Sequence, residues 1–548
     1  MCVSNKPHVG HRHRTKKDIP HMMKKISILL LATVMTAGLQ AQPPINRETE
    51  FQTIKFEQFF NTLNALYVDT LDNDALIETA IRSMLSELDP HSSYSSAEEM
   101  KAIAESFEGS FSGIGVEFDV IRDTIVVVNT ISGGPAESVG MMPNDRIVAV
   151  DGDDVTGISR ADVPKRLRGP KGSKLDVTVL RRGTAQPLNF RLMRDDIPIH
   201  TVDAAYMAAP GIAYIKVNRF AETTMKEFTE AAASLAPFDS MILDLRGNGG
   251  GLLDQAIEMS EYFLPKGSII VSTEGRAVRS TTYKSPRSGA FTQGKLAILI
   301  DSSSASGSEI VAGAVQDWDR GIIIGQQSFG KGLVQRQIPL LDGSAVRITV
   351  ARYHTPSGRV IQRPFTPGDM EGYYIDHLKR SIDSSYADSV DTDTPEYKTL
   401  RTGRTVRGGG GIRPDITVQL DTTRNYGFWN RLVAEGIINE YLNTYLERER
   451  TNLRNEYPDF RDFEQSFHIN DDMIADLTAM AAERGITPTE EQRLDNLPDT
   501  RTNLKALLAR KMWDMNEYFR IINTGDEAFD KAVNILNDSH EYERILKP

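Results

Sequence analysis

LAILIDSSSASGSEIVAGAVQDWDRGIIIGQQSFGKGLVQ, the stretch from Leu296 to Gln335, decides the fold of the chain. Its first five residues are a continuous apolar run, which predicts a short buried strand. Small hydroxyl residues follow at 302–308, and residues 309–315 have the apolar face of a helix. This order places a hydroxyl group at a helix N-terminus, where unpaired N–H groups and the helix dipole favour negative charge. The stretch therefore predicts a site that stabilises an oxyanion.

The serine-rich turn also has simpler interpretations. Ser306 and Glu309 have the S-x-x-E spacing of a capping box, in which Ser306 is only a helix N-cap. Lys331 ends a G-x-x-x-x-G-K pattern, which is most of a phosphate-binding loop. The phosphate-loop interpretation fails because Gly332 replaces the hydroxyl residue that would hold magnesium. A lysine in a glycine-flanked turn is otherwise usually a solvated surface residue.

The same stretch resembles the signature of the carboxy-terminal processing proteases, the S41 family of serine peptidases. The matching parts are SASGSE at 304–309, QD at 316–317 and GQQSFGKGLVQ at 325–335. The resemblance implies that Ser306 is the nucleophile, Lys331 the general base and Gln335 the residue that orients the lysine. It implies that the N–H of Gly307 belongs to the oxyanion hole, although the family usually has alanine there. It implies a structural role for Asp317.

A glycine-rich loop upstream, DLRGNGGG at 244–251, is the second candidate part of the site. It lies between an apolar run and a predicted helix, so a dinucleotide-binding loop is the rival interpretation. That interpretation fails because Leu252 stands where G-x-G-x-x-G requires its third glycine. The loop resembles the D-L-R-x-N-x-G-G motif of the same family. The resemblance implies that either Gly250 or Gly251 donates the second hydrogen bond of the oxyanion hole.

Residues 106–193 combine short alternating strands with glycine-rich turns. The segment FSGIGV at 111–116 resembles the carboxylate-binding loop of a PDZ domain, and later PDZ landmarks follow in order. Its glycines allow consecutive N–H groups to converge on a terminal carboxylate, and the bound peptide then adds as a strand. We therefore expect protein or peptide C-termini as substrates. The candidate binding residues are Gly113, Ile114, Gly115 and Val116.

A basic turn, RGPKGS at 168–173, follows the predicted helix at 159–167 and matches a motif of the same family. The simple interpretation is a solvated hairpin turn. The alternative hypothesis is that Arg168 couples peptide binding in the PDZ domain to the alignment of Lys331.

The chain has 548 residues, which predicts several domains. Strands alternate with helices after residue 196, which predicts a mixed sheet covered by helices, and the resemblance implies an S41 core of the crotonase and Clp-protease type. We expect a mixed α/β multidomain protein with helical regions at both ends. The expected divisions are an over-long N-terminus with signal peptide at 1–41, a helical region at 42–100, a β-sandwich-like PDZ domain at 101–195, the protease core at 196–420 and a helical region at 421–548. Residues 364–405 are polar and separate two family motifs, so we expect an inserted loop or lid there.

The N-terminal segment is typical of a secretory signal peptide. Lys24 and Lys25 precede an apolar run at 26–35, and Ala41 ends a plausible cleavage site. The run is too short to favour spanning a membrane. Cys2 is the only cysteine, so the cleaved chain has no disulfide and no cysteine for a lipid anchor. We expect an exported protein, periplasmic in a cell with two membranes and at most peripheral at the membrane.

Composition excludes some partners. The net charge is −12 and no basic stripe is present, which argues against nucleic-acid binding. We expect no cofactor, and the histidines at 1–21 do not predict a metal site. An apolar stripe from Trp429 to Tyr445 has helical spacing, which is typical of a core or of a subunit contact. A homo-oligomer through the C-terminal helices and an adaptor of unknown identity are therefore open hypotheses.

The implied chemistry makes a demand on Lys331. A lysine with its ordinary pKa near 10.4 is protonated at neutral pH and cannot remove a proton from serine. Burial has to lower the pKa of Lys331, and Gln335 suits this because it brings no negative charge. Two alternatives stay open: a serine-histidine hydrolase with His354 or His200 as base, and a non-catalytic scaffold that binds peptides through the PDZ domain. His91 is more simply a hydrogen-bonding residue of a turn than a base.

Overall fold

The computed structural model describes residues 47–131, 133–390, 394–419, 421 and 424–548. The chain divides into two units, Met1–Ala80 and Ile81–Pro548, and each is described by itself. The predicted signal peptide lies outside the described residues. Within those residues, the structure contains no helix with the length and apolar content that crossing a membrane requires.

The N-terminal region is helical, as predicted. It contains α2 (Arg47–Leu66) and α3 (Asn73–Ser86), the second of which continues into the second unit. Glu48 and Glu50 lie in the first turn of α2, where carboxylates interact favourably with the helix dipole. Helix α4 (Ala97–Glu108) follows and begins with a capping box between Ser96 and Glu99.

The predicted PDZ domain is built on an antiparallel sheet. Along β7, the buried side chains of Leu175, Val177 and Val179 alternate with more exposed ones. A short pair outside the sheet joins β2 (Ser110–Gly113) to β9 (Asp195–Pro198). The spatial order of the main sheet is β3 (Val116–Ile121), β4 (Thr124–Thr130), β5 (Arg146–Val150), β7 (Lys174–Leu180) and β8 (Leu188–Met193), with β6 (Asp153–Asp154) beside β5.

The two helices of this domain are short: α5 (Pro135–Ser138) and α6 (Val163–Leu167). The predicted helix at 159–167 was too long, because α6 begins only at Val163. Pro164 explains the difference, since proline fits the first turn of a helix but not its interior.

The predicted protease core is built on a second, mostly parallel sheet. Five of its strands are parallel, and the edge strand β10 is antiparallel to β11. The strand predicted from the apolar run at 296–300 belongs to this sheet, and so do other strands from the predicted alternation after residue 196. In spatial order the strands are β10 (Val202–Ala209), β11 (Ile212–Val217), β12 (Ser240–Asp244), β15 (Lys295–Ile300), β16 (Ile322–Gly325) and β21 (Ile416–Thr417).

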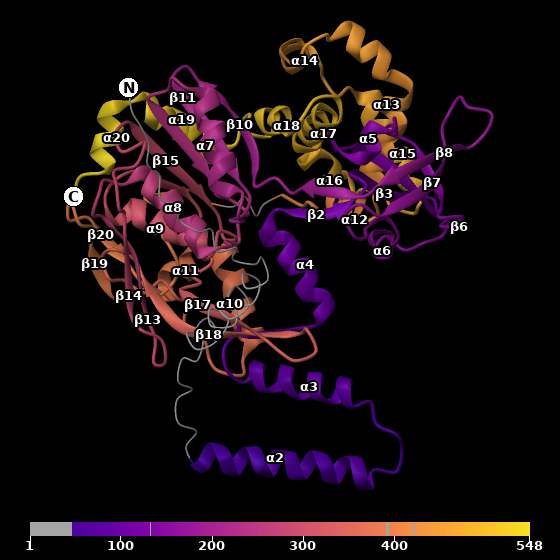
Figure 1. The fold of residues 1–548 in the computed structure, drawn as a ribbon. Helices are drawn as coiled ribbons and strands as arrows, with labels where there is room; N and C mark the ends of the chain where they lie inside the picture. The colour runs from indigo at the N-terminus through magenta and orange to yellow at the C-terminus, as the bar shows by residue number, and fades with distance from the viewer. Residues whose placement is uncertain (1–46, 132, 391–393, 420, 422–423) are drawn as a thin grey trace, which may run out of the picture. The chain divides into compact units, whose positions relative to one another are not determined.

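Both faces of this sheet are covered, which explains why its strands are continuous apolar runs. Leu296, Ile298 and Ile300 of β15 face α7 (Thr224–Leu235), α8 (Leu253–Phe263) and α9 (Gly307–Asp317) in one cluster. Ala297 and Leu299 face α19 (Glu527–Asn537) and α20 (Ser539–Ile545) in another. Figure 1 shows α7 and α8 on one side of this sheet and α19 and α20 on the other.

A third sheet carries the strand that follows Lys331. This sheet contains a hairpin whose first strand begins at Leu333. The central strand β18 (Ala345–His354) pairs with β17 (Leu333–Pro339), β1 (Ser93–Ser95) and β13 (Ile269–Glu274), and β13 pairs with β14 (Thr281–Lys284).

The segment at 364–405, which we expect to be an inserted loop or lid, contains regular secondary structure. It contains α10 (Met370–Ile382), α11 (Ser384–Val390) and β19 (Glu396–Lys398), and β20 (Thr405–Arg407) closes a hairpin with β19. Asp369 caps α10 by accepting a hydrogen bond from Gly372 N–H, and Tyr373 of this helix is buried. Composition missed these elements because a helix that buries one face can be polar elsewhere.

The C-terminal region is helical, as predicted, but its helices pack in two different places. The apolar stripe predicted from Trp429 lies in an intrachain core that includes Ile437 and Tyr441. By contrast, α19 and α20 pack against one face of the core sheet. The helices of the first group are α12 (Gly427–Ala434), α13 (Ile437–Glu456), α14 (Phe460–Ser466), α15 (Asp471–Ala482), α16 (Glu490–Asp495), α17 (Leu497–Met512) and α18 (Met515–Ile522).

Candidate active site

The serines of SASGSE have different surroundings. The buried hydroxyl of Ser304 donates to the Leu245 carbonyl at 2.9 Å, and that of Ser308 donates to the Asn248 carbonyl at 2.8 Å. Both bonds attach the serine turn to the glycine loop at 244–251. Ser306 lines a cleft and has φ 54° and ψ −107°, a conformation that a non-glycine residue adopts only when its surroundings impose it. The fold therefore presents Ser306 to the cleft at the start of α9.

Glu309 joins the nucleophile turn to the lysine turn. Its buried carboxylate accepts hydrogen bonds from the N–H groups of Ser306 at 2.8 Å, Gly330 at 2.7 Å and Lys331 at 2.9 Å, and from the Ser328 hydroxyl at 2.6 Å. Burial raises the pKa of Glu309 to about 7, although these hydrogen bonds act in the opposite direction. The glutamate of the predicted capping box thus holds both candidate catalytic segments.

Lys331 and Gln335 are in direct contact. The Lys331 amine donates to Gln335 Oε1 at 2.9 Å, and the Gln335 amide nitrogen donates to the His91 carbonyl. Burial lowers the pKa of Lys331, and the nearby guanidinium of Arg347 lowers it further. Because Gln335 is neutral, it orients the amine without the rise in pKa that a carboxylate would cause.

Ser306 and Lys331 line the same cleft, which has a volume of about 470 Å³. The apolar residues Leu333 and Val334, which follow Lys331 in the chain, also line it, whereas Phe329 packs against His377 with the ring centroids 4.5 Å apart. Within the described residues, no hydrogen bond joins the Ser306 hydroxyl to the Lys331 amine. The remaining lining residues are Phe107, Gly249, Gly250, Gly251, Leu252, Leu253, Gly307, Ile310, Gln335, Gln337, Arg347 and Tyr353.

The two candidate oxyanion glycines of the loop differ in what their N–H groups do. Gly250 N–H already donates to Asn248 Oδ1 at 2.8 Å. Gly251 has φ 149° and forms a β-bridge with Phe220. The two hydrogen bonds of this bridge use the Gly250 carbonyl and the Leu252 N–H, so the Gly251 N–H takes no part in it. Among the described residues, neither Gly251 N–H nor Gly307 N–H has an acceptor. These two N–H groups are therefore available to a ligand in the cleft.

Neither of the two histidines considered as alternative bases lines this cleft. His354 lies 3.6 Å from a carboxylate oxygen of Glu274, and His200 lies 3.8 Å from one of Glu227. Asp317 also lies away from the cleft, at the other end of α9, where it forms a buried ion pair with Arg359 at 2.7 Å.

The structure adds supporting residues that sequence reasoning missed. The Tyr353 hydroxyl donates to the Lys331 carbonyl at 2.6 Å and lies 3.3 Å from the Ser306 carbonyl, so it spans both segments. Its place in the YHTPSGR segment at 353–359 was a signal for it, whereas Arg347 carried no recognisable motif. His91 acts through its backbone carbonyl, and burial lowers the pKa of its imidazole to about 4.

The four predicted carboxylate-binding residues lie together in the PDZ domain. Gly113, Ile114, Gly115 and Val116 line a small pocket with Phe111, Phe118, Pro164, Leu167 and Arg168. The pocket lies beside β3, which is an edge strand of the sheet and therefore has a free edge for an added strand.

Arg168 does not contact Lys331. Its guanidinium lies 4.1 Å from the ring centroid of Phe111 and donates to Glu105 on α4 at 2.7 Å. Phe107, two residues farther along α4, lines the cleft of Ser306. The end of α4 therefore contacts the PDZ pocket on one side and the catalytic cleft on the other.

Comparison with known proteins agrees with this architecture. Residues 211–371 match peptidase family S41, residues 112–192 match the PDZ domain, and residues 27–99 match the activating protease CtpB N-terminal domain. Residues 428–514 match a family of unknown function.

The chain spans most of the length of the curated relatives that it matches. The carboxy-terminal-processing protease of Bartonella bacilliformis is 38% identical over 62% of this chain and 81% of its own length. The carboxy-terminal processing protease CtpB of Bacillus subtilis is 32% identical over 62% of this chain and 71% of its own. A solved structure of a photosystem II D1 C-terminal processing protease is 30% identical, with a TM-score of 0.32, over 57% of this chain and 85% of its own. The chain belongs to the carboxy-terminal processing proteases, serine-type peptidases of family S41 with a PDZ domain.

Proposed function

We propose that the chain is an exported endopeptidase that binds the C-terminal tails of proteins in its PDZ pocket and cleaves them with Ser306 and Lys331. The observation that carries this proposal is the shared cleft. It holds a strained serine at a helix N-terminus and a buried lysine whose amine is bonded to a neutral amide.

In the proposed reaction, the neutral Lys331 amine removes the hydroxyl proton of Ser306 while Oγ attacks the scissile carbonyl carbon. The resulting ammonium returns the proton to the leaving amine, and the C–N bond breaks to give an acyl-enzyme at Ser306. Water then attacks the ester with Lys331 again as base, the acyl C–Oγ bond breaks, and the ammonium returns the proton to Ser306 Oγ as the carboxylic acid product leaves. The lowered pKa of Lys331 supports this role, because it increases the neutral fraction of the amine.

The negative charge on the tetrahedral intermediate needs two donors. We assign these to the N–H groups of Gly307 and Gly251. Gly250 is the weaker candidate because Asn248 already accepts its hydrogen. Gly307 N–H also lies at the positive end of the α9 dipole, which favours the oxyanion.

Substrate binding is proposed to complete the Ser306–Lys331 contact, since catalytic hydrogen bonds often tighten only in the substrate complex. The coupling would run from the PDZ pocket through Arg168 and Glu105 to α4 and Phe107. A peptide bound in the pocket competes with the groups that contact Arg168. The shift of α4 that results changes the shape of the cleft.

The organisation of the chain is part of the proposal. We propose a PDZ domain at 101–195, a core at 196–420 and a helical region at 421–548, with α19 and α20 serving the core. The segment at 1–41 supports export, and hence a periplasmic location in a cell with two membranes. Self-association through the C-terminal helices has less support, because the predicted stripe is largely used within the chain. An adaptor protein is a further hypothesis.

The test is incubation of wild-type protein and Ser306→Ala with the exported proteins of the cell, followed by identification of new C-termini. The proposal expects new C-termini with the wild type and none with Ser306→Ala. Equal processing by both would refute a serine nucleophile at 306. Binding of tail peptides without cleavage by the wild type would instead favour the non-catalytic scaffold.

A further inference from the structure

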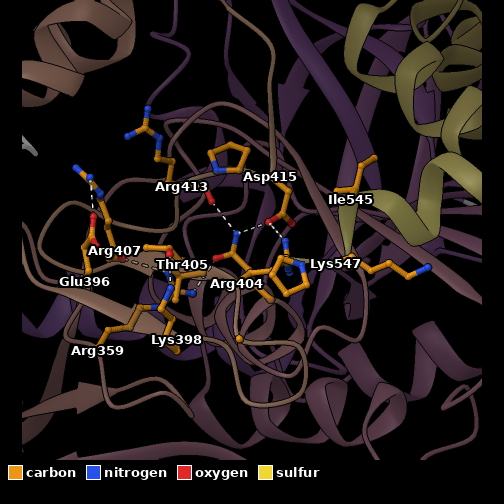
Figure 2. A pocket seen from close by; sticks show the side chains of 15 residues that line it. Arg359, Glu396, Lys398, Arg404, Thr405, Arg407, Arg413, Asp415, Ile545 and Lys547 are labelled. Carbon is orange, nitrogen blue, oxygen red and sulfur yellow. Dashed lines mark hydrogen bonds and ion pairs between the residues drawn. The ribbon is translucent and has the colours of Figure 1, made fainter.

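A cavity of about 970 Å³ lies at the end of α9 opposite Ser306. Figure 2 shows the side chains that line it. Gln316, in the last turn of α9, forms part of its wall. The hairpin of β19 and β20 and the end of α20 supply other parts. The cavity thus combines the protease core with the inserted segment and the C-terminal helices, and no residue of the proposed active site lines it.

The charged residues that line this cavity are mostly cations. Two acidic residues, Glu396 and Asp415, also line it. Asp317, Asp319 and Glu543 pair with three of these cations from outside the lining, so cations exceed carboxylates only among the residues that face the cavity. The cationic residues are Arg359, Lys398, Arg404, Arg407, Arg413 and Lys547.

The deep part of the wall is held rigid by internal ion pairs. Arg359 pairs with Asp317 at 2.7 Å, and Arg404 pairs with Asp319 at 2.8 Å and with Asp415 at 2.6 Å. In the described part of the chain, the buried Nη2 of Arg404 has no hydrogen-bond partner. An unsatisfied buried donor is uncommon, and an acceptor oxygen that enters the wall would satisfy it.

The charged side chains at the rim of the cavity are more exposed, and their partners hold them less firmly. The Lys398 amine donates to a neutral group, the Thr405 hydroxyl, at 2.7 Å. The pair of Arg407 with Glu396 spans 2.8 Å, and those side chains are 34% and 57% exposed. Exposed ion pairs contribute little to stability, so these cations can exchange a partner for a ligand oxygen at low cost.

We propose that this cavity binds a small molecule that carries two or more phosphate groups. Guanidinium groups match phosphate oxygens in bidentate geometry, and the volume lies within the range of small-molecule sites. Figure 2 shows Arg407 and Lys547 on opposite sides of the cavity, where Arg407 pairs with Glu396 and Lys547 with Glu543. The site is independent of the proposed active site.

The test is calorimetric titration of inorganic triphosphate into the full chain at low salt. We expect saturable one-to-one binding that weakens as salt is added. The double variant Lys398→Gln with Arg413→Gln removes two exposed cations of the rim and is expected to weaken binding about tenfold or more. The control, Arg276→Gln with Arg279→Gln, removes two exposed cations between β13 and β14 and is expected to bind as the wild type does.

Unfolding midpoints of both double variants without triphosphate show whether they fold as the wild type does. No saturable binding by the wild type, or an equal loss in both double variants, would overturn the proposal. A second arm measures co-sedimentation with phosphatidylglycerol vesicles. Vesicle binding that the Lys398 and Arg413 variant loses, together with no triphosphate binding, would assign the cavity to a lipid headgroup and overturn the small-molecule proposal.

Discussion

Gln335 accepts a hydrogen bond from the amine of Lys331 at 2.9 Å and in turn donates to the carbonyl of His91. The orientation of the candidate base is thus set by a neutral side chain that is itself fixed by a turn 244 residues earlier in the chain. A neutral partner matters here because the amine has to lose its proton before it can act as a base.

Gln335→Glu places a carboxylate beside the amine and should raise the pKa of Lys331. Since the reactive form is the neutral amine, the rising limb of kcat/KM against pH should move to higher pH, by about one unit or more. Activity at neutral pH falls accordingly. Gln337→Glu is the matched control, because Gln337 lines the same cleft but does not contact the Lys331 amine. An unmoved limb in Gln335→Glu would show that Lys331 does not set the pH profile.

Glu309→Gln tests the buried carboxyl that joins the two catalytic segments. The folded chain raises the pKa of Glu309 to about 7 from 4.5, so the folded state binds more protons between these pH values. Titration of this group therefore lowers the free energy of unfolding of the wild type by about 3 kcal/mol as the pH rises from 4.5 to 7. Glutamine does not titrate, so the stability difference between wild type and variant should change by that amount across this window. Thermal unfolding at pH 5 and pH 8 measures it, and a pH-independent difference would contradict the assignment.

Gly307→Ala restores the residue that is usual in the family, yet we expect it to be unfavourable here. An added Cβ would lie 2.9 Å from Cδ2 of Phe220, a buried ring that occupies the space. Overpacking of this kind costs about 1–3 kcal/mol and should also displace the Gly307 N–H group that we propose for the oxyanion hole. Phe220→Leu in the same chain should relieve the contact and recover part of the activity. Unfolding midpoints and kcat/KM for a tail peptide check both variants, and full activity of the single variant would contradict the packing argument.

Arg168→Ala removes the contacts with Phe111 and Glu105 that join the PDZ pocket to α4. If this contact transmits peptide binding, cleavage of tailed substrates should fall about tenfold or more, a loss typical of a charged hydrogen bond. Cleavage of a short peptide without a PDZ-binding tail should change little. Arg166→Ala on the same helix is the control, because Arg166 pairs with Asp153 on the exposed surface. Wild-type rates on tailed substrates would end the coupling hypothesis.

Local patterns predicted the part of the site that is local in sequence. The strand, turn and helix around Ser306 follow from one apolar run, one hydroxyl cluster and one helical face. The contact of Gln335 with His91 could not be predicted in this way, because it joins two segments that only the fold brings together. The same holds for α19 and α20: an amphipathic helix indicates that one face is buried, but not which sheet covers it.

The measurement that tests the central claim most directly compares kcat/KM for one tail-bearing peptide in the wild type, Lys331→Ala and His354→Ala. Removing a catalytic base typically costs several powers of ten, about 10⁴-fold or more. We predict a loss of that order in Lys331→Ala and nearly wild-type activity in His354→Ala, whose histidine lies outside the cleft. Retained activity in Lys331→Ala, with the large loss in His354→Ala instead, would contradict the assignment of Lys331 as the base that activates Ser306.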